Sequence, residues 1–162
     1  MRWLALACAL ALAAPAAAQE KKRFELDFGP VDIERTGWHD YKLPPLPDED
    51  LTFGLKLTAP DGGRLQHLPK ARVRITLVNE LNEVVFDAGD ELANWTRAES
   101  TQAWFLYLRG VDNQPRGPDG GWGTSAHPRR TGTYSLTVET VSSDVTMSKF
   151  VVRLMGVGGG WK

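Results

Sequence analysis

Alternation of apolar and polar residues with a period of two is the feature that most constrains the fold of this chain. Phe24, Leu26 and Phe28 alternate with acidic residues, and the same pattern recurs in four later segments. These segments are residues 51–57, 73–77, 134–138 and 150–154. Because successive side chains of a strand point to opposite faces, each segment predicts a β-strand with one buried face. Residues 84–86 and 103–108 are apolar on both faces, and we expect central strands or strands covered on their second side there.

Turn-forming residues separate the predicted strands. Asp61-Gly62-Gly63 and residues 87–90 supply side chains that tolerate turn dihedral angles. Residues 73–79 and 83–87 predict a hairpin around Glu80-Leu81-Asn82. No convincing amphipathic helix is present. About seven to eight short strands at this spacing predict an all-β fold, a single antiparallel β-sandwich of the immunoglobulin-like or jelly-roll-like type.

The start of the chain has the anatomy of a secretory signal peptide. Met1-Arg2 is followed by an apolar run over residues 3–14, and Ala16-Ala17-Ala18 offers the small residues that a signal peptidase needs. The run is shorter than the ~20 apolar residues that span a bilayer, so we expect no transmembrane anchor. We predict a signal peptide over residues 1–18 and a periplasmic or secreted mature protein that begins at Gln19.

The remainder of the chain has the size of one domain. We expect the β-sandwich to cover residues 19–155 and a flexible glycine-rich tail to cover residues 156–162. Cys8 is the one cysteine and lies in the predicted signal peptide, so we expect no disulfide and no cysteine metal site. The 19 basic and 20 acidic residues nearly balance, which argues against a nucleic-acid partner.

Residues 110–132 depart from the strand pattern. The segment is rich in glycine and proline, and so long a connection is uncommon in a compact domain unless it is functional or disordered. It also carries tryptophan and arginine, the residue types enriched in binding hot spots. The candidate binding residues are Trp122, Arg116, His127, Arg129 and Arg130. We predict a mobile loop that orders on binding, with Trp122 as the anchor; the alternative is a Trp122 side chain packed permanently on the sandwich.

The sequence offers weak candidates for catalysis or metal binding. No serine lies in a Gly-x-Ser-x-Gly elbow, and Ser125 and His127 share a loop without a third residue to orient the histidine. Acidic residues at 48–50 and 87–91 could supply oxygen ligands to calcium, but neither group follows the twelve-residue loop pattern. We predict no catalytic residue, no metal ligand and no cofactor, and binding of calcium at the acidic groups stays open.

Spacings near both ends of the mature chain point to one family. Tyr41-Lys42-Leu43-Pro44-Pro45 precedes Leu51-Thr52-Phe53-Gly54-Leu55, and residues 132–139 precede a closing strand at Phe150. In these motifs the chain resembles a family of bacterial secreted β-sandwich domains of unknown function. The resemblance implies a sandwich fold and a periplasmic address, and it brings no activity or site. The chain departs from the family in lacking a plausible lipobox.

These observations favour a binding domain over an enzyme. The leading interpretation is a non-enzymatic domain that contacts a protein partner through residues 110–132, with immunity or accessory proteins as one version. The second is a carbohydrate- or envelope-binding module, which needs two or three tryptophan or tyrosine rings coplanar on one exposed face. The least favoured is a small hydrolase. We expect Trp104 in the core, and Trp38 and Trp95 partly buried near strand ends.

Overall fold

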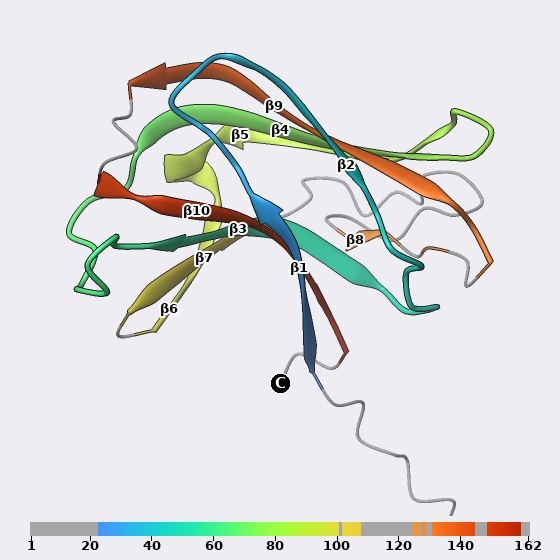
Figure 1. Cartoon of the computed structure of the whole chain (residues 1–162), viewed down its shortest axis with the longest axis horizontal. Coiled ribbons are helices and arrows are strands. Elements are labelled where there is room, and N and C mark those ends of the chain that lie inside the picture. The colour runs from blue at the N-terminus through green and yellow to red at the C-terminus, as the bar shows by residue number, and fades with distance from the viewer. Residues whose placement is uncertain are drawn as a thin grey trace, which may run out of the picture.

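The structure, a computed structural model, describes residues 23–100, 102–107, 125–126, 128, 131–144 and 149–159. Ten strands and one short 3-10 turn in these residues form two antiparallel sheets packed face to face (Figure 1). The predicted all-β sandwich is therefore confirmed. The predicted signal peptide lies outside the described residues, among which no helix is long and apolar enough to cross a membrane.

The larger sheet has the strand order β1-β10-β3-β7-β6, with the short β8 paired to β3. Its strands are β1 (Phe24–Pro30), β3 (Leu51–Thr58), β6 (Thr96–Glu99), β7 (Ala103–Tyr107), β8 (Ser125–Ala126) and β10 (Val151–Gly158). The last strand thus lies between the first and the third. Immunoglobulin domains differ, because their first and last strands belong to opposite sheets.

The smaller sheet has the order β2-β9-β4-β5. Its strands are β2 (Gly37–Lys42), β4 (Lys70–Asn79), β5 (Val84–Glu91) and β9 (Tyr134–Asp144), and the turn η1 (Leu92–Asn94) leads from β5 to β6. The predicted hairpin joins β4 to β5: the Asn79 N–H donates to the Glu83 carbonyl at 3.0 Å. Asn82 takes a φ of 60° in the turn, a conformation that asparagine tolerates.

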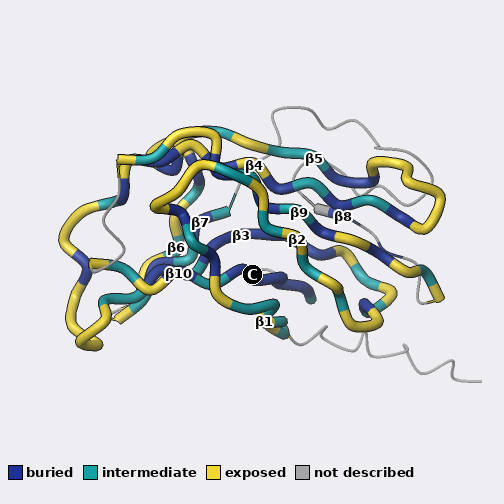
Figure 2. Tube along the Cα trace, turned by 45° about the horizontal axis from the view of Figure 1, so that its top comes forward, coloured by how far each residue is buried: buried dark blue, intermediate teal, exposed yellow. Residues whose placement is uncertain are grey.

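The core lies between the two sheets, and β4 and β9 contribute every second side chain to it over most of their length (Figure 2). Phe53 of β3 and Phe86 of β5 are fully buried, and their ring centroids lie 5.5 Å apart across the two sheets. Full burial of such a side chain contributes about 1.5–3 kcal/mol to stability. The alternating apolar faces read from the sequence therefore supply the main stabilising contacts.

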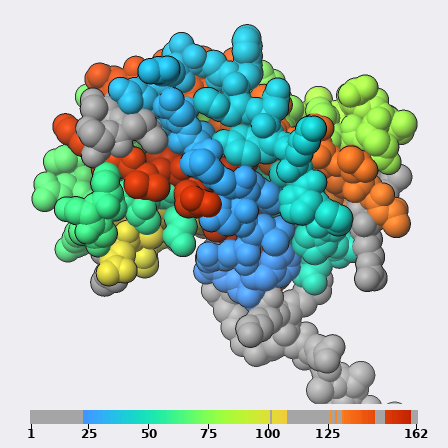
Figure 3. Space-filling view, viewed as in Figure 1, coloured from blue at the N-terminus to red at the C-terminus, as the bar shows by residue number. Residues whose placement is uncertain are grey.

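The connection between β1 and β2 closes one side of the sandwich (Figures 1 and 3). Val31 and Ile33 of this connection are fully buried. The Val31 N–H also donates to the Val152 carbonyl of β10 at 2.9 Å. The chain thus crosses from the larger sheet to the smaller one while adding to the core.

The expectation of a central or covered strand at residues 84–86 is wrong for β5, which is an edge strand. The register between β4 and β5 shifts after Leu77: Leu77 pairs with Phe86, but the next residue, Val78, pairs with Val84. Val85 is the extra residue of a β-bulge, and both Val85 and Phe86 are buried while Val84 is exposed. Consecutive apolar residues here reflect the bulge. The apolar run in β7, by contrast, does lie in an internal strand between β3 and β6.

The predicted tail also requires correction, because β10 continues through Gly158. Gly156 and Gly158 pair with Leu26 and Phe24 of β1. A Cβ on Gly156 would lie 2.9 Å from the Phe28 ring, and one on Gly158 would collide with the Phe24 ring. These glycines lie inside a strand and leave room for the aromatic rings of β1. The segment is therefore a strand, although its glycine-rich composition resembles that of a flexible tail.

Candidate functional site

The binding residues predicted from the sequence lie outside the described part of the chain. They are Arg116, Trp122, His127, Arg129 and Arg130. Within the same segment, Ser125 and Ala126 form β8, which pairs with the start of β3. The binding role of residues 110–132 therefore stays a prediction.

The described tryptophans differ sharply in exposure. Trp104 is 8% exposed, which confirms the predicted core position, and the Arg97 guanidinium lies 4.9 Å from its ring centroid. Trp95 is 4% exposed, and its indole N–H donates to the Asp90 carbonyl at 3.1 Å. Trp38 is 72% exposed. The expected partial burial is therefore wrong for both: Trp95 is buried, and Trp38 is mostly exposed.

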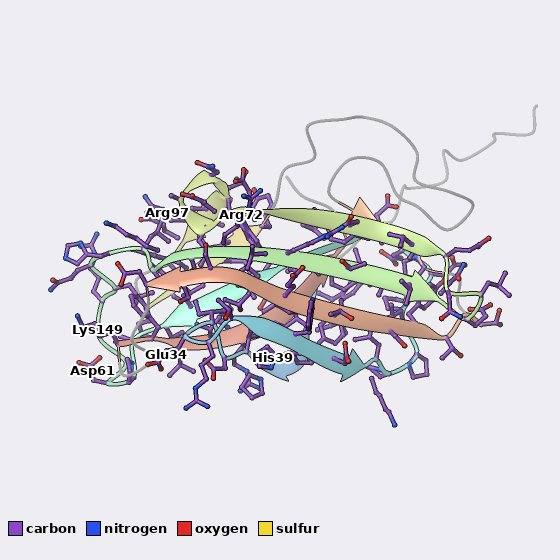
Figure 4. The ribbon with its side chains drawn as sticks, turned by 90° about the horizontal axis from the view of Figure 1, so that it is seen from above. Glu34, His39, Asp61, Arg72, Arg97 and Lys149 are labelled. Carbon is purple, nitrogen blue, oxygen red and sulfur yellow. The ribbon has the colours of Figure 1, made fainter. Side chains whose placement is uncertain are left out.

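Trp38 lies on β2, the edge strand of the smaller sheet, and the sequence did not reveal this strand. Only Tyr41 of β2 provides a ring to the core, where its hydroxyl donates to the Pro30 carbonyl at 2.8 Å. Burial raises the pKa of the Tyr41 hydroxyl above its usual value. Because side chains alternate along a strand, Trp38 points to the outer face of the sheet, which Figure 4 views from above.

Strand register places Trp38 at the end of a row that crosses the whole sheet. Trp38 pairs with Glu139 of β9, Glu139 pairs with Arg74 of β4, and Arg74 pairs with Gly89 of β5. A Cβ on Gly89 would lie 2.8 Å from the Arg74 Cβ. The glycine therefore lets the Arg74 side chain lie close against β5.

A second row beside the first is held by polar contacts. The Thr137 hydroxyl donates to Asp40 Oδ1 at 2.8 Å. Arg74 reaches into this row and donates to both carboxylate oxygens of Asp87, at 2.7 and 2.6 Å. The Thr76 hydroxyl adds a contact to Asp87 at 3.3 Å. The charged groups on this part of the sheet are thus held in defined positions.

A shallow groove of about 520 Å³ crosses the same surface. Its lining includes Arg72, Arg74, Asp87, Gly89, Glu139 and Val141. Val141 is 45% exposed on the same outer face as Glu139, and a register shift between Arg72 and Val73 leaves it as an extra residue on β9. We call the surface formed by Trp38, Asp40, Arg74, Asp87, Glu139 and Val141 the β2–β5 face.

The electrostatics of the β2–β5 face combine both signs of charge. The hydrogen bonds from Arg74 to Asp87 raise the pKa of the guanidinium above its usual value, and the charges of Asp87 and Glu139 act in the same direction. Arg74 therefore keeps its charge. An exposed aromatic ring beside such a fixed polar pattern is suited to recognition.

Asp87 and Asp90, which belong to one of the acidic groups considered for calcium, make contacts that support local structure. Asp87 binds Arg74, and Asp90 Oδ1 accepts hydrogen bonds from the Glu91 N–H and the Asn94 amide at 2.7 and 3.1 Å. Within the described ranges, no group of three histidine, cysteine or acidic side chains is placed to hold a metal ion. These carboxylates are best understood as turn and sheet contacts.

Comparisons with protein-family models, with curated proteins and with solved structures found no match. The chain is therefore described by its own geometry, as an antiparallel β-sandwich with an exposed tryptophan on its smaller sheet.

Proposed function

We propose that this protein is a non-enzymatic binding domain that recognises a protein partner through the β2–β5 face. The exposure of Trp38 is the observation that carries the proposal. Because Trp38 is 72% exposed, most of its ring contributes no burial to the fold. In a complex it would bury its ring at little entropic cost, because the strand already holds its backbone.

The surroundings of Trp38 favour a protein over a glycan. A sugar platform needs several coplanar rings, and within the described residues the β2–β5 face has one exposed ring. Phe105 and Tyr107 on the other sheet stack on each other, with centroids 5.6 Å apart, and are half-buried. Charged groups of both signs around an aromatic anchor are typical of protein interfaces, where they set orientation and partner choice.

The proposal includes a location outside the cytoplasm, which rests on the signal-peptide pattern of residues 1–18. Intact mass of the exported product tests this part, and we expect a chain that begins at Gln19. A species that retains residues 1–18 would contradict it.

A photo-crosslinking residue at position 38 tests the proposed interface. We expect one discrete protein adduct from the native host, and none from the same residue at Val151, which is 39% exposed on the outer face of the other sheet. The identified partner is then titrated against purified wild type and Trp38→Ala. Loss of a hot-spot tryptophan costs 2 kcal/mol or more, so we expect affinity to fall about 30-fold.

The same titration separates the two candidate surfaces. A Trp122→Ala variant reports on the segment at residues 110–132, whose described strand β8 pairs with the start of β3. Full affinity of Trp38→Ala, with affinity lost in Trp122→Ala, would move the interface to that segment. If the wild-type protein binds glycans and the crosslinking experiment gives no protein adduct, the carbohydrate alternative is supported instead.

A further inference from the structure

One end of the sandwich contains a cavity that is separate from the β2–β5 face. The cavity has a volume of about 710 Å³ and lies between the loop from β3 to β4 and the start of β10. Figure 4 shows Asp61 of this loop and Lys149 before β10 at the same end of the molecule. Its volume is within the ~300–1,000 Å³ range of small-molecule pockets, but like the groove on the β2–β5 face it is open to solvent, so a ligand would be only partly enclosed.

The wall of the cavity is partly apolar. Leu65 is 6% exposed, Pro69 is buried, and Leu68 and Phe150 are half-buried. Leu68 and Phe150 pack against the core from outside, so the apolar wall continues the hydrophobic interior to the surface. A ligand with an apolar body would gain burial there.

The rim of the cavity carries cations. Arg64, Lys70 and Lys149 line it and are exposed. No salt bridge involves any of them within the described part of the chain. Unpaired cations beside an apolar wall favour an anionic group on the ligand.

Two acidic side chains of the lining, Asp61 and Asp144, offset part of this charge, which leaves three cations against two carboxylates. Asp61 Oδ1 accepts the Gly63 N–H at 2.9 Å, and the Gly62 N–H donates to the Ala59 carbonyl at 3.0 Å. Gly62 takes a φ of 72°, which closes the turn. Asp61 therefore shapes the loop, and Asp144 is the other carboxylate of the lining.

A second cavity of about 670 Å³ adjoins the first and shares Leu68, Pro69, Lys70 and Asp144 with it. Ser143 lines this second cavity, and its buried hydroxyl oxygen has no hydrogen-bond partner within the described residues. This oxygen is not accessible to solvent, so it is not a contact for a ligand in the open space.

We propose that these joined cavities bind a small organic anion with an apolar body, such as a medium-chain carboxylate. The anionic group binds at Arg64, Lys70 and Lys149, and the apolar body lies along Leu65, Leu68 and Phe150. The residues named for this ligand are not part of the β2–β5 face, so either proposal can fail without the other.

Nuclear magnetic resonance titration of the full mature chain with three probes tests the proposal. Octanoate combines the anion and the apolar body, octanol lacks the charge, and acetate lacks the apolar body. We expect octanoate to shift amide resonances at residues 59–70 and 149–150, with weaker shifts from octanol and none from acetate. Equal binding of octanol, shifts confined to other residues, or no shifts at millimolar octanoate would overturn the proposal.

Charge variants supply the second readout. Arg64→Gln and Lys149→Gln each weaken octanoate binding about fivefold, because each removes a partly solvated ion contact worth up to ~1 kcal/mol. Lys42→Gln, at the far end of β2, leaves affinity unchanged. These side chains are exposed, so the variants retain the wild-type spectrum elsewhere. Equal affinity of all three variants would contradict the anion site even if octanoate binds.

Discussion

Arg74 and Asp87 form a two-point ion pair across β4 and β5, with Nε 2.7 Å from Oδ1 and Nη2 2.6 Å from Oδ2. Planar guanidinium and carboxylate groups match in this geometry, which is stronger than a single contact. Gly89 leaves the space that the Arg74 stem occupies. The pair thus holds the charged centre of the β2–β5 face in one arrangement.

A double-mutant cycle with Arg74→Met and Asp87→Asn should give a coupling free energy of about 0.5–1 kcal/mol, measured by chemical denaturation. The coupling should fall at 1 M NaCl, since salt screens partly exposed pairs. The control is Arg153 with Asp27, which are joined by one contact, Nε to Oδ2 at 2.6 Å. Equal coupling in both pairs would show that the two-point geometry adds nothing.

Trp38→Ala should change the free energy of unfolding by less than ~0.5 kcal/mol, because the side chain is already exposed. Trp95→Ala is the matched control: its ring is 4% exposed, and its loss should cost about 3–5 kcal/mol. Urea denaturation of both variants measures the difference. A large loss in Trp38→Ala would mean that this ring serves the fold, which would remove the basis of the proposed interface.

Trp104→Ala should destabilise the protein by about 3–5 kcal/mol, because it empties a core site. Arg97→Ala removes the cation above the ring and should cost about 0.5–1 kcal/mol. His67→Ala is the control, since this side chain is exposed and should tolerate truncation.

Thermal unfolding with and without a chelator should give the same melting temperature. A lower melting temperature in chelator would reveal a metal contribution.

Gly158→Ala should destabilise the fold by about 1–3 kcal/mol, because its Cβ would collide with the Phe24 ring. The amide of Val157, inside β10, should exchange slowly with deuterium. Phe24→Leu in the same chain should recover part of the loss by giving the new methyl group room. Fast exchange at Val157 together with a neutral Gly158→Ala would restore the flexible tail.

Asp27 should make stability depend on pH. Partial burial raises its pKa, but hydrogen bonds from Arg153 at 2.6 Å and from the Gly29 N–H at 3.0 Å, with the charges of Arg153 and Lys56, lower it below its usual value overall. A folded-state pKa below the unfolded value stabilises the protein above pH ~4, and this contribution is lost as pH falls through the folded-state pKa.

Asp27→Asn should therefore cost about 0.2–1 kcal/mol at pH 7, a range typical of exposed pairs, and the deficit should shrink below pH ~4. Denaturation midpoints from pH 2 to 8 measure it. Arg153→Gln should reproduce the same trend. A deficit that grows on acidification would have the wrong sign for this ion pair.

The local pattern predicted the internal strands and two of the four edge strands, β1 and β5, but not the edge strands β2 and β6. The segment around Ile75 and that around Leu136 were recognised because their alternation reflects one buried face. β2 is not visible in the sequence, because Tyr41 is its only hydrophobic residue that packs against the core and one such residue gives no alternation. β6 was missed because Arg97 and Glu99 occupy the positions opposite buried Leu106 and Trp104, and such inward-pointing charges protect an edge strand from pairing further.

The candidate site depended on register, which the local pattern does not contain. Trp38, Glu139 and Arg74 are distant in sequence and become neighbours only when β2, β9 and β4 pair. Similarly, Val85 and Val141 can be assigned as bulge residues only from their partners on the next strand. Composition, by contrast, points to the segment at residues 110–132, because its glycine, proline, tryptophan and arginine residues are visible without any strand pairing.

The sequence by itself determined that the chain forms short strands with one apolar face, since a side-chain period of two is a property of each strand alone. It also determined the hairpin at Asn79–Asn82, whose contacts are local. Tertiary structure alone decided that β10 lies between β1 and β3, that Gly158 makes room for Phe24, and that Trp38 faces water. The physical reason is that strand order and burial follow from contacts between distant segments, which minimise exposed apolar surface for the whole chain at once.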